Sequence, residues 1–231
     1  MLKSSSFSVL VLILILVCLF CPANSFAAKQ LVLKVVGTVE NQIITNRDVE
    51  ASFTVDRALY DEGNFLPISY GSEEFTSALN RLLIEWMVRD EADTFGVAKV
   101  SEAEIGQSLT SVKTRIAANS AVKSRWATLG FSDGQLKDMV SRKLKANRFI
   151  KYKSNSSYVQ VTDEEARDYF NKNRLKFGTM DFESFKGNIK KYLEKKNAED
   201  RLRDWLTILR KKHKVTDLLG GVSDNSSPEG L

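Results

Sequence analysis

The pattern of apolar positions along this chain changes from a strand-like run to long helical repeats. Residues 31–39, LVLKVVGTV, are rich in β-branched side chains and predict a strand, and Ile43 and Ile44 form a second short extended piece. A hairpin turn at Glu40 and Asn41 would join the two, although this dipeptide is not one of the pairs that favour tight two-residue turns.

Helices follow, and capping patterns mark where they begin. Thr45 with Asp48 predicts the start of the first helix. A break over residues 63–71, GNFLPISYG, separates it from a second helix over about residues 72–95, which Gly96 ends. We expect the second helix to form the centre of the core, because large apolar side chains recur along it at helical spacing: Phe75, Leu79, Leu82, Leu83 and Trp86.

Three further capping boxes predict three more helix starts: Ser101 with Glu104, Ser132 with Gln135, and Thr162 with Glu165. A last long helix is expected over residues 182–212, where apolar side chains repeat at threes and fours. Residues 214–219, KVTDLL, predict a short strand, and the polar tail over residues 220–231 is expected to be disordered.

The terminal strand needs a partner, since a single strand leaves its backbone groups unpaired. The other strand-like segment lies at the N-terminal side, so we expect the two ends to pair. The predicted fold class is therefore mainly α, a multi-helix module over residues 28–219 with a small β element that pairs N-terminal and C-terminal strands. Residues 153–157, KSNSS, look like an internal joint of this module.

The first residues have the layout of a secretory signal peptide. Lys3 precedes an apolar run over residues 9–20, and a polar stretch with Pro22 follows. The run is shorter than the roughly 20 residues of a membrane-spanning helix. We therefore expect residues 1–27 to be removed by cleavage between Ala27 and Ala28, and the protein to be exported.

Cleavage would also remove both cysteines, Cys18 and Cys21, which excludes disulfide and thiol chemistry from the mature chain. Neither cysteine follows a small residue, so a lipid anchor is not expected. The formal net charge of the chain is +5, which is too mild and too dispersed to indicate a nucleic-acid partner.

Candidate chemistry is sparse. His213 is the single histidine, and it is predicted to cap the last helix or to face solvent. Zinc sites and catalytic triads built on histidine need partners that the mature chain lacks, so no metal site, no cofactor and no enzymatic activity are expected. The acidic clusters at 163–165 and 73–74 lie in first turns of predicted helices, where negative charge stabilises the helix.

Two apolar segments are candidates for substrate binding: Phe65, Leu66, Ile68 and Tyr70 around Pro67, and Trp126 with Phe131 beside a glycine. Each segment either tucks into the core or forms an exposed patch of the kind that binds partners. The basic stretch over residues 137–153 either is a solvated helix face or attracts acidic surfaces, such as an anionic membrane leaflet.

Residues 35–49, VVGTVENQIITNRDV, resemble the opening strand, turn and first helix of the SurA-type periplasmic chaperones. The likeness continues through ALNRLLIEWMVRDEADTFGV at 78–97 and VSEAEI at 100–105. The segments at 161–177 and 181–215 look like those that flank the parvulin domains of that family, with the last helix and strand returning to the N-terminal module.

Only residues 178–180, Gly-Thr-Met, stand where fuller relatives carry a parvulin domain, and a lone His213 cannot supply the histidine pair of parvulin chemistry. The resemblance implies the chaperone module alone. It would be an ATP-independent periplasmic holdase for unfolded outer-membrane or secreted proteins, bound through apolar surface. Alternatives are a scaffold subunit of a periplasmic secretion complex and a divergent prolyl isomerase, and two chains could exchange their terminal helices in a homodimer.

Overall fold

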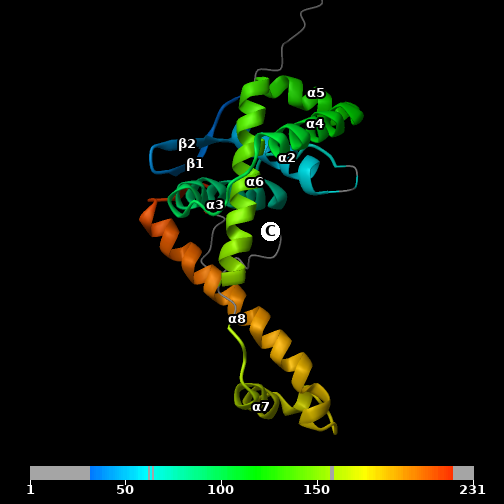
Figure 1. Ribbon diagram of the computed structural model, residues 1–231. Coiled ribbons are helices and arrows are strands. Elements are labelled where there is room, and N and C mark those ends of the chain that lie inside the picture. Colours follow the sequence, from blue (N-terminus) through cyan, green and yellow to red (C-terminus); the bar gives the residue numbers. More distant parts are fainter. Residues whose placement is uncertain (1–31, 62, 64, 157–158, 221–231) are drawn as a thin grey trace, which may run out of the picture. The chain divides into compact units, whose positions relative to one another are not determined.

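The computed structural model describes residues 32–61, 63, 65–156 and 159–220, and these residues are mainly helical, as predicted. The predicted leader, its cleavage site and residues 221–231 lie outside the described residues. The elements treated below belong to the unit that begins at Leu33. In chain order (Figure 1) they are β1 (Val35–Val39), β2 (Gln42–Thr45), α2 (Asn46–Tyr60), α3 (Glu73–Phe95), α4 (Glu102–Ala118), α5 (Ser120–Leu129), α6 (Asp133–Ser156), α7 (Asp163–Lys172), the 3₁₀ helix η1 (Arg174–Lys176), α8 (Phe182–Lys212) and β3 (Thr216–Asp217).

The three strands form one antiparallel sheet with β1 at its centre, in the order β2-β1-β3. Thr38 is paired with Ile43 on one side and with Thr216 on the other. The predicted pairing of N-terminal and C-terminal strands is therefore confirmed. The predicted hairpin is confirmed as well, with Glu40 and Asn41 in its turn.

The predictions for β1 and β3 were both too long, for local reasons. Lys34 exchanges backbone and side-chain bonds with Asn46 instead of extending the ladder: its N–H donates to Asn46 Oδ1 at 2.8 Å, and its carbonyl accepts from the Asn46 N–H at 2.9 Å. At the other end, Lys214 has a φ of 48°, which is incompatible with a strand. The Asp217 side chain then accepts from the Leu219 N–H at 2.8 Å and turns the chain away.

The capping patterns place the helix starts correctly. The boxes of Thr45 with Asp48, Ser132 with Gln135, and Thr162 with Glu165 each form both reciprocal bonds. The box at Ser101 forms only half. Its hydroxyl accepts from the Glu104 N–H, but the Glu104 carboxylate instead accepts from Arg148 at 2.6 Å.

Two helix boundaries differ from the sequence pattern. Asn119 separates α4 from α5, because its side chain accepts from the N–H groups of Ala121 and Val122 at 3.1 and 3.2 Å and starts a new helix. In the predicted joint, residues 153–156 continue α6 to its end, so these four residues are helical. Residue 157 lies outside the described part, and a division of the module there stays a prediction.

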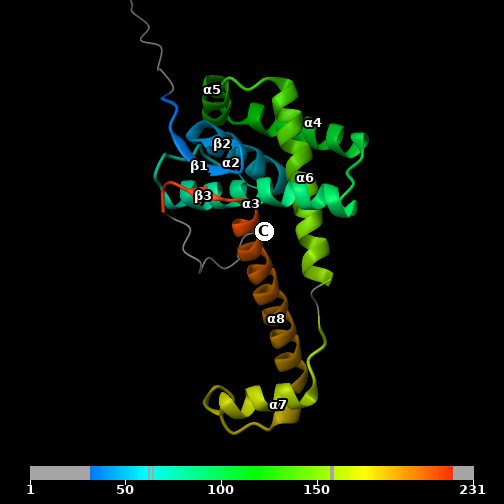
Figure 2. The ribbon, with the colours of Figure 1, turned by 90° about the vertical axis from the view of Figure 1, so that its left-hand side faces the viewer.

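The main core is built around α3, as expected. Phe75, Leu79, Leu82 and Leu83 are completely or almost completely buried, and Trp86 is partly buried against them. The C-terminal half of α8 joins this core through Leu202, Leu206 and Leu209. A second apolar cluster lies between α7 and the start of α8, and Figure 2 shows α7 against that end of α8.

Candidate functional site

A cavity of about 730 Å³ lies among α2, α3 and α6, and we call it the α2–α3–α6 cleft. Each helix contributes one stripe of residues. On α2 the spacing of Phe53, Arg57 and Tyr60 by four and three residues places them on one helix face. The lining residues combine aromatic rings with both signs of charge: Phe53, Asp56, Arg57, Tyr60, Asp61, Glu73, Glu74, Ser77, Arg81, Asn147 and Lys151.

The cleft adjoins a smaller cavity of about 50 Å³, and the two share Asp56, Tyr60, Arg81 and Asn147. The floor of the smaller cavity holds Lys143 of α6, whose side chain is only 3% exposed. The ammonium group lies 2.7 Å from Asp56 Oδ1, 2.8 Å from Glu85 Oε2 and 2.8 Å from Ser52 Oγ. Its three N–H donors are therefore all engaged.

Ion pairing keeps these buried groups charged. Burial alone would raise the pKa of Glu85, but the charges of Lys143 and then Arg142 outweigh it and hold that pKa below its ordinary value. Burial would likewise lower the pKa of Lys143, and Asp56 and Glu85 reverse the effect and raise it. The floor of the cleft is thus a closed ionic network.

Tyr60 stands where the network meets the open part of the cleft. Burial raises the pKa of its phenol, a hydrogen bond with Asn147 opposes that rise, and the nearby Asp56 charge adds to it. The hydroxyl is neutral at ordinary pH and is hydrogen-bonded to Asn147 of α6. At the rim, Arg57 is ion-paired with Asp61, and Arg81 lies 3.6 Å from Asp56.

The cleft suits binding by contact. Its volume lies in the range of about 300–1,000 Å³ that is typical of ligand sites. Tyr60 supplies exposed ring surface, the buried Phe53 forms part of the wall, and Ser77 and Asn147 supply uncharged hydrogen-bonding groups. The charges at the floor are already paired with each other, so they stabilise the helices around the cleft and leave the uncharged groups to meet a ligand.

The loop that the sequence singled out is divided between core and surface. Phe65 is 8% exposed, and Ile68 is packed against the main core. Leu66 is 71% exposed, whereas Tyr70 is 43% exposed and meets the edge of Phe75 at a ring distance of 5.2 Å. Each of the two expectations therefore holds for half of this loop.

Trp126 and Phe131 form a separate pair, stacked with ring centroids 5.8 Å apart. The guanidinium of Arg47 lies 3.8 Å from the centroid of the Phe131 ring. Phe131 also lines a cavity of about 180 Å³ beside β2, α3 and α6. The structure does not bring this pair or the loop residues into the lining of the α2–α3–α6 cleft.

Sequence reasoning missed the cleft, although one signal pointed to it. Lys143 lies on the apolar stripe of α6, three residues after Val140 and three before Ala146, and Glu85 follows the buried Leu82 of α3 in the same way. A charged residue at a core position of an amphipathic helix needs an ionic partner on the facing helix. The partners lie far away in sequence, so the pattern alone could not name them.

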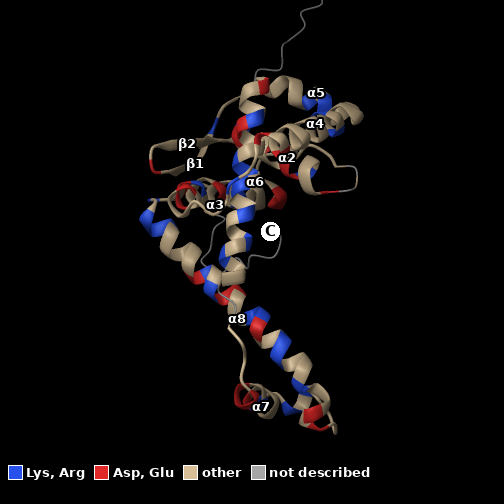
Figure 3. Cartoon of the chain, viewed as in Figure 1, with Lys and Arg blue, Asp and Glu red and all other residues tan. Residues whose placement is uncertain are grey.

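The basic stretch over residues 137–153 is largely neutralised by carboxylates on neighbouring helices. Figure 3 shows the two signs of charge interleaved around α6. Five of its basic residues form ion pairs with acidic residues of α2, α3 and α4: Lys137 with Glu102, Arg142 with Glu85, Lys143 with Asp56 and Glu85, Lys145 with Asp93, and Arg148 with Glu104. These ion pairs link α6 to α2, α3 and α4.

His213 is at the C-cap position of α8, as predicted, but the expectation that it faces solvent is wrong. Its ring is buried, with Nδ1 2.7 Å from Glu40 Oε1 and Nε2 3.4 Å from Glu91 Oε1. Because β3 pairs with β1, the end of α8 lies against the β1–β2 hairpin turn. This turn covers the His213 ring.

Comparison of the sequence with models of protein families and with curated proteins gave no match. Within the described ranges, the helices lack an apolar stretch long enough to pass through a bilayer.

Proposed function

We propose that this protein is an ATP-independent chaperone of the periplasm that holds unfolded outer-membrane or secreted polypeptides, and that the α2–α3–α6 cleft receives them. The observation that carries the proposal is the cleft itself, in which aromatic rings and uncharged polar groups stand above a closed ionic floor. The antiparallel return of β3 to β1, which the resemblance to SurA-type chaperones implies, supports it further.

An extended client segment offers alternating side chains and unpaired backbone groups, and the cleft has a counterpart for both. Apolar client side chains would contact Tyr60, and backbone amides would hydrogen-bond to Ser77 and Asn147. The rim has both signs of charge, so it would tolerate clients of varied sequence. Such contacts are individually weak, which suits reversible holding and release.

Export is the premise for a mechanism without ATP. The predicted leader over residues 1–27 would place the mature chain in a compartment that lacks ATP, where binding and release depend on surface contact alone. Leu66 and Tyr70 are the members of the predicted loop patch that are still exposed, and they would extend the apolar surface offered to clients.

A tryptophan placed in the cleft tests the proposal. Ser77 is exposed on α3 and lines the cleft, so Ser77→Trp would fill it without disturbing the core. The matched control is Ser111→Trp, at an exposed position of α4 outside the lining. We expect the purified protein to delay aggregation of an unfolded outer-membrane protein, measured by light scattering, and Ser77→Trp to lose most of that delay while Ser111→Trp keeps it.

Each other result counts against part of the proposal. A wild-type protein that does not delay aggregation at modest molar excess would contradict the chaperone function, all the more if one folded partner co-purified in a stable complex. Equal protection by the wild type and Ser77→Trp would contradict the assignment of the cleft. Catalysed cis/trans exchange of a proline peptide would instead favour the isomerase alternative.

A further inference from the structure

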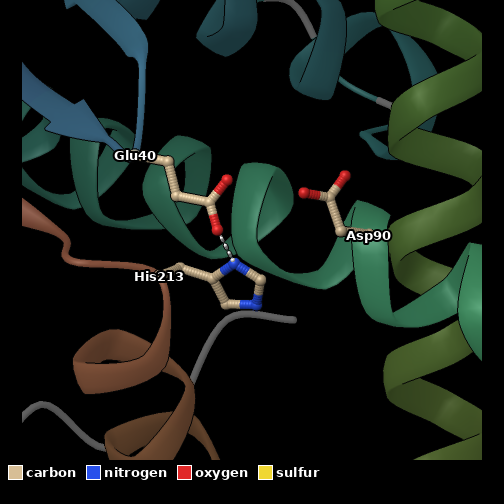
Figure 4. A group of neighbouring side chains, drawn as sticks. All are labelled: Glu40, Asp90 and His213. Carbon is tan, nitrogen blue, oxygen red and sulfur yellow. Dashed lines mark hydrogen bonds and ion pairs between the residues drawn. The ribbon is translucent and has the colours of Figure 1, made fainter.

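Three potential metal ligands from distant parts of the chain meet at the end of α8 (Figure 4): Glu40 of the β1–β2 turn, Asp90 of α3 and His213. One ligand atom from each side chain lies within 4.8 Å of the other two. The imidazole is buried, Asp90 is partly buried and Glu40 is exposed. The cluster is therefore closed on the histidine side and reachable from solvent on the Glu40 side.

A backbone contact fixes Glu40 and His213 relative to each other. The Glu40 N–H donates to the His213 carbonyl at 3.0 Å, which joins the hairpin turn to the end of α8. Among the described residues, the non-glycine residues with positive φ are Glu40, at 51°, and Lys214, at 48°. Glu40 makes this contact, and Lys214 directly follows His213. Such backbone conformations persist only where the surroundings enforce them.

The surroundings of His213 match those of a metal-ligating histidine. Nδ1 faces the carboxylate of Glu40, whereas Nε2 faces Glu91, whose side chain is buried and also ion-paired with Lys212. A histidine that ligates through one ring nitrogen commonly donates its other N–H to a carboxylate, which fixes the tautomer. Here that carboxylate belongs to Glu91, the residue after Asp90. One turn of α3 therefore supplies both a ligand and the group that orients the ring.

We propose that Glu40, Asp90 and Nδ1 of His213 bind one divalent transition-metal ion, with Zn²⁺ as the best fit. One imidazole and two carboxylates suit Zn²⁺, whereas Ca²⁺ and Mg²⁺ prefer oxygen ligands throughout. Bonds of about 2.0–2.1 Å in a tetrahedral site separate ligand atoms by about 3.4 Å. Nδ1 of His213 and Oε1 of Glu40 are 2.7 Å apart, so these two atoms would move apart around the ion. The Asp90 side chain would leave its ion pair with Arg89 to reach the ion, and water would fill the fourth position.

The ion would fasten the C-terminal end of the fold to the hairpin. It would join the β1–β2 turn, α3 and the end of α8. Its binding energy would therefore add to the stability of the paired chain ends. This role is independent of client binding in the α2–α3–α6 cleft, and the two proposals stand or fall separately.

Titration of the purified, chelator-treated protein, made without a histidine tag, tests the site. We expect one Zn²⁺ per chain by isothermal titration calorimetry and a higher midpoint of thermal unfolding when Zn²⁺ is saturating. Asp90→Asn and Glu40→Gln should each weaken binding at least about 100-fold, and Glu91→Gln, which removes the orienting carboxylate and its ion pair with Lys212, about 10-fold. Co²⁺ in place of Zn²⁺ should give the visible absorption of a tetrahedral site.

The matched control is Asp93→Asn, one turn further along α3, where the carboxylate is ion-paired with Lys145. It should bind Zn²⁺ as the wild type does. Circular dichroism of each metal-free variant distinguishes lost ligation from lost folding, since the exposed Glu40 is not needed for the core. The proposal is overturned if the wild type does not bind Zn²⁺, or if folded Asp90→Asn and Glu40→Gln bind it as tightly as the control.

Discussion

At the scale of single residues, Lys143 is a buried charge beside the cleft, with a side chain only 3% exposed. Burying an ammonium group is costly unless other groups compensate for its lost hydration. Here Asp56, Glu85 and Ser52 take all three N–H donors, and Arg142 provides a second positive charge for Glu85. Removal of Lys143 would therefore take one cation from each of the two carboxylates, Glu85 and Asp56.

Lys143→Met is expected to lower the free energy of unfolding by about 3–5 kcal/mol, because Glu85 then keeps only Arg142 and Asp56 keeps only Arg81, at 3.6 Å, as a cationic partner. The measurement is urea unfolding followed by circular dichroism. Lys145→Met, two residues along the same helix, removes only a more exposed pair with Asp93 and should change the free energy by less than about 1 kcal/mol. Equal effects of the two substitutions would contradict the special status of Lys143.

At the scale of elements, α8 contributes to two separate apolar clusters. Its first turns pack against α7 in a small apolar cluster, and its last turns complete the main core. The bounds of α8 could be read from the sequence, because an apolar side chain recurs every third or fourth residue and Asp181 provides an N-cap. The break at Asn119 was not predicted, although asparagine is a favoured N-cap residue, because Val122 stands where a capping box would have Glu or Gln.

The ionic network of the cleft could not be predicted from the sequence either. Lys143 is 58 residues from Glu85 and 91 from Ser52 along the chain. Amphipathic spacing shows which face of each helix is buried, but it does not say which residue on one helix meets which residue on another. The same holds for His213, whose position at a helix end was predictable while its burial depended on the pairing of β3 with β1.

The contact of α7 with α8 is sensitive to acid through Asp163. Hydrogen bonds from Lys186 and then from Lys190 lower the pKa of this carboxyl from 3.8 to about 2. Because the folded pKa is lowered, the contribution of this contact is present above about pH 3.8 and is lost as the pH falls through 2. We expect the protection of α7 amides, measured relative to the intrinsic exchange rate at each pH, to fall over that interval while protection in α3 does not.

Removal of either lysine should shift the titration itself. Lys186→Met and Lys190→Met should each move the NMR titration midpoint of Asp163 back toward 3.8, whereas Lys195→Met, paired with Glu199 further along α8, should leave it unchanged. An unshifted midpoint in both test variants would contradict the assigned cause.

At the scale of the whole unit, the pairing of β3 with β1 joins segments from opposite ends of the described chain. The contact is small: two residues of β3 pair with Gly37 and Thr38, and the Leu218 N–H donates to the Val36 carbonyl at 3.0 Å. It nevertheless sets the position of the last turns of α8 in the core and of His213 beside the hairpin. Gly37 permits it, because a Cβ there would lie 2.9 Å from the Thr216 carbonyl oxygen.

Gly37→Ala should therefore separate the chain ends. The added methyl group meets backbone, which cannot yield as a flexible side chain would, so we expect a loss of about 1–3 kcal/mol in the free energy of unfolding. Exchange of the Leu218 amide, followed by NMR, should quicken more than that of amides in α7. The control is Gly106→Ala in α4, where a Cβ meets nothing within 4 Å and helix propensity predicts a gain of about 0.5–1 kcal/mol. The same chemical change should thus have opposite signs at the two positions, and a stabilised Gly37→Ala would show that β3 is not held where the sheet places it.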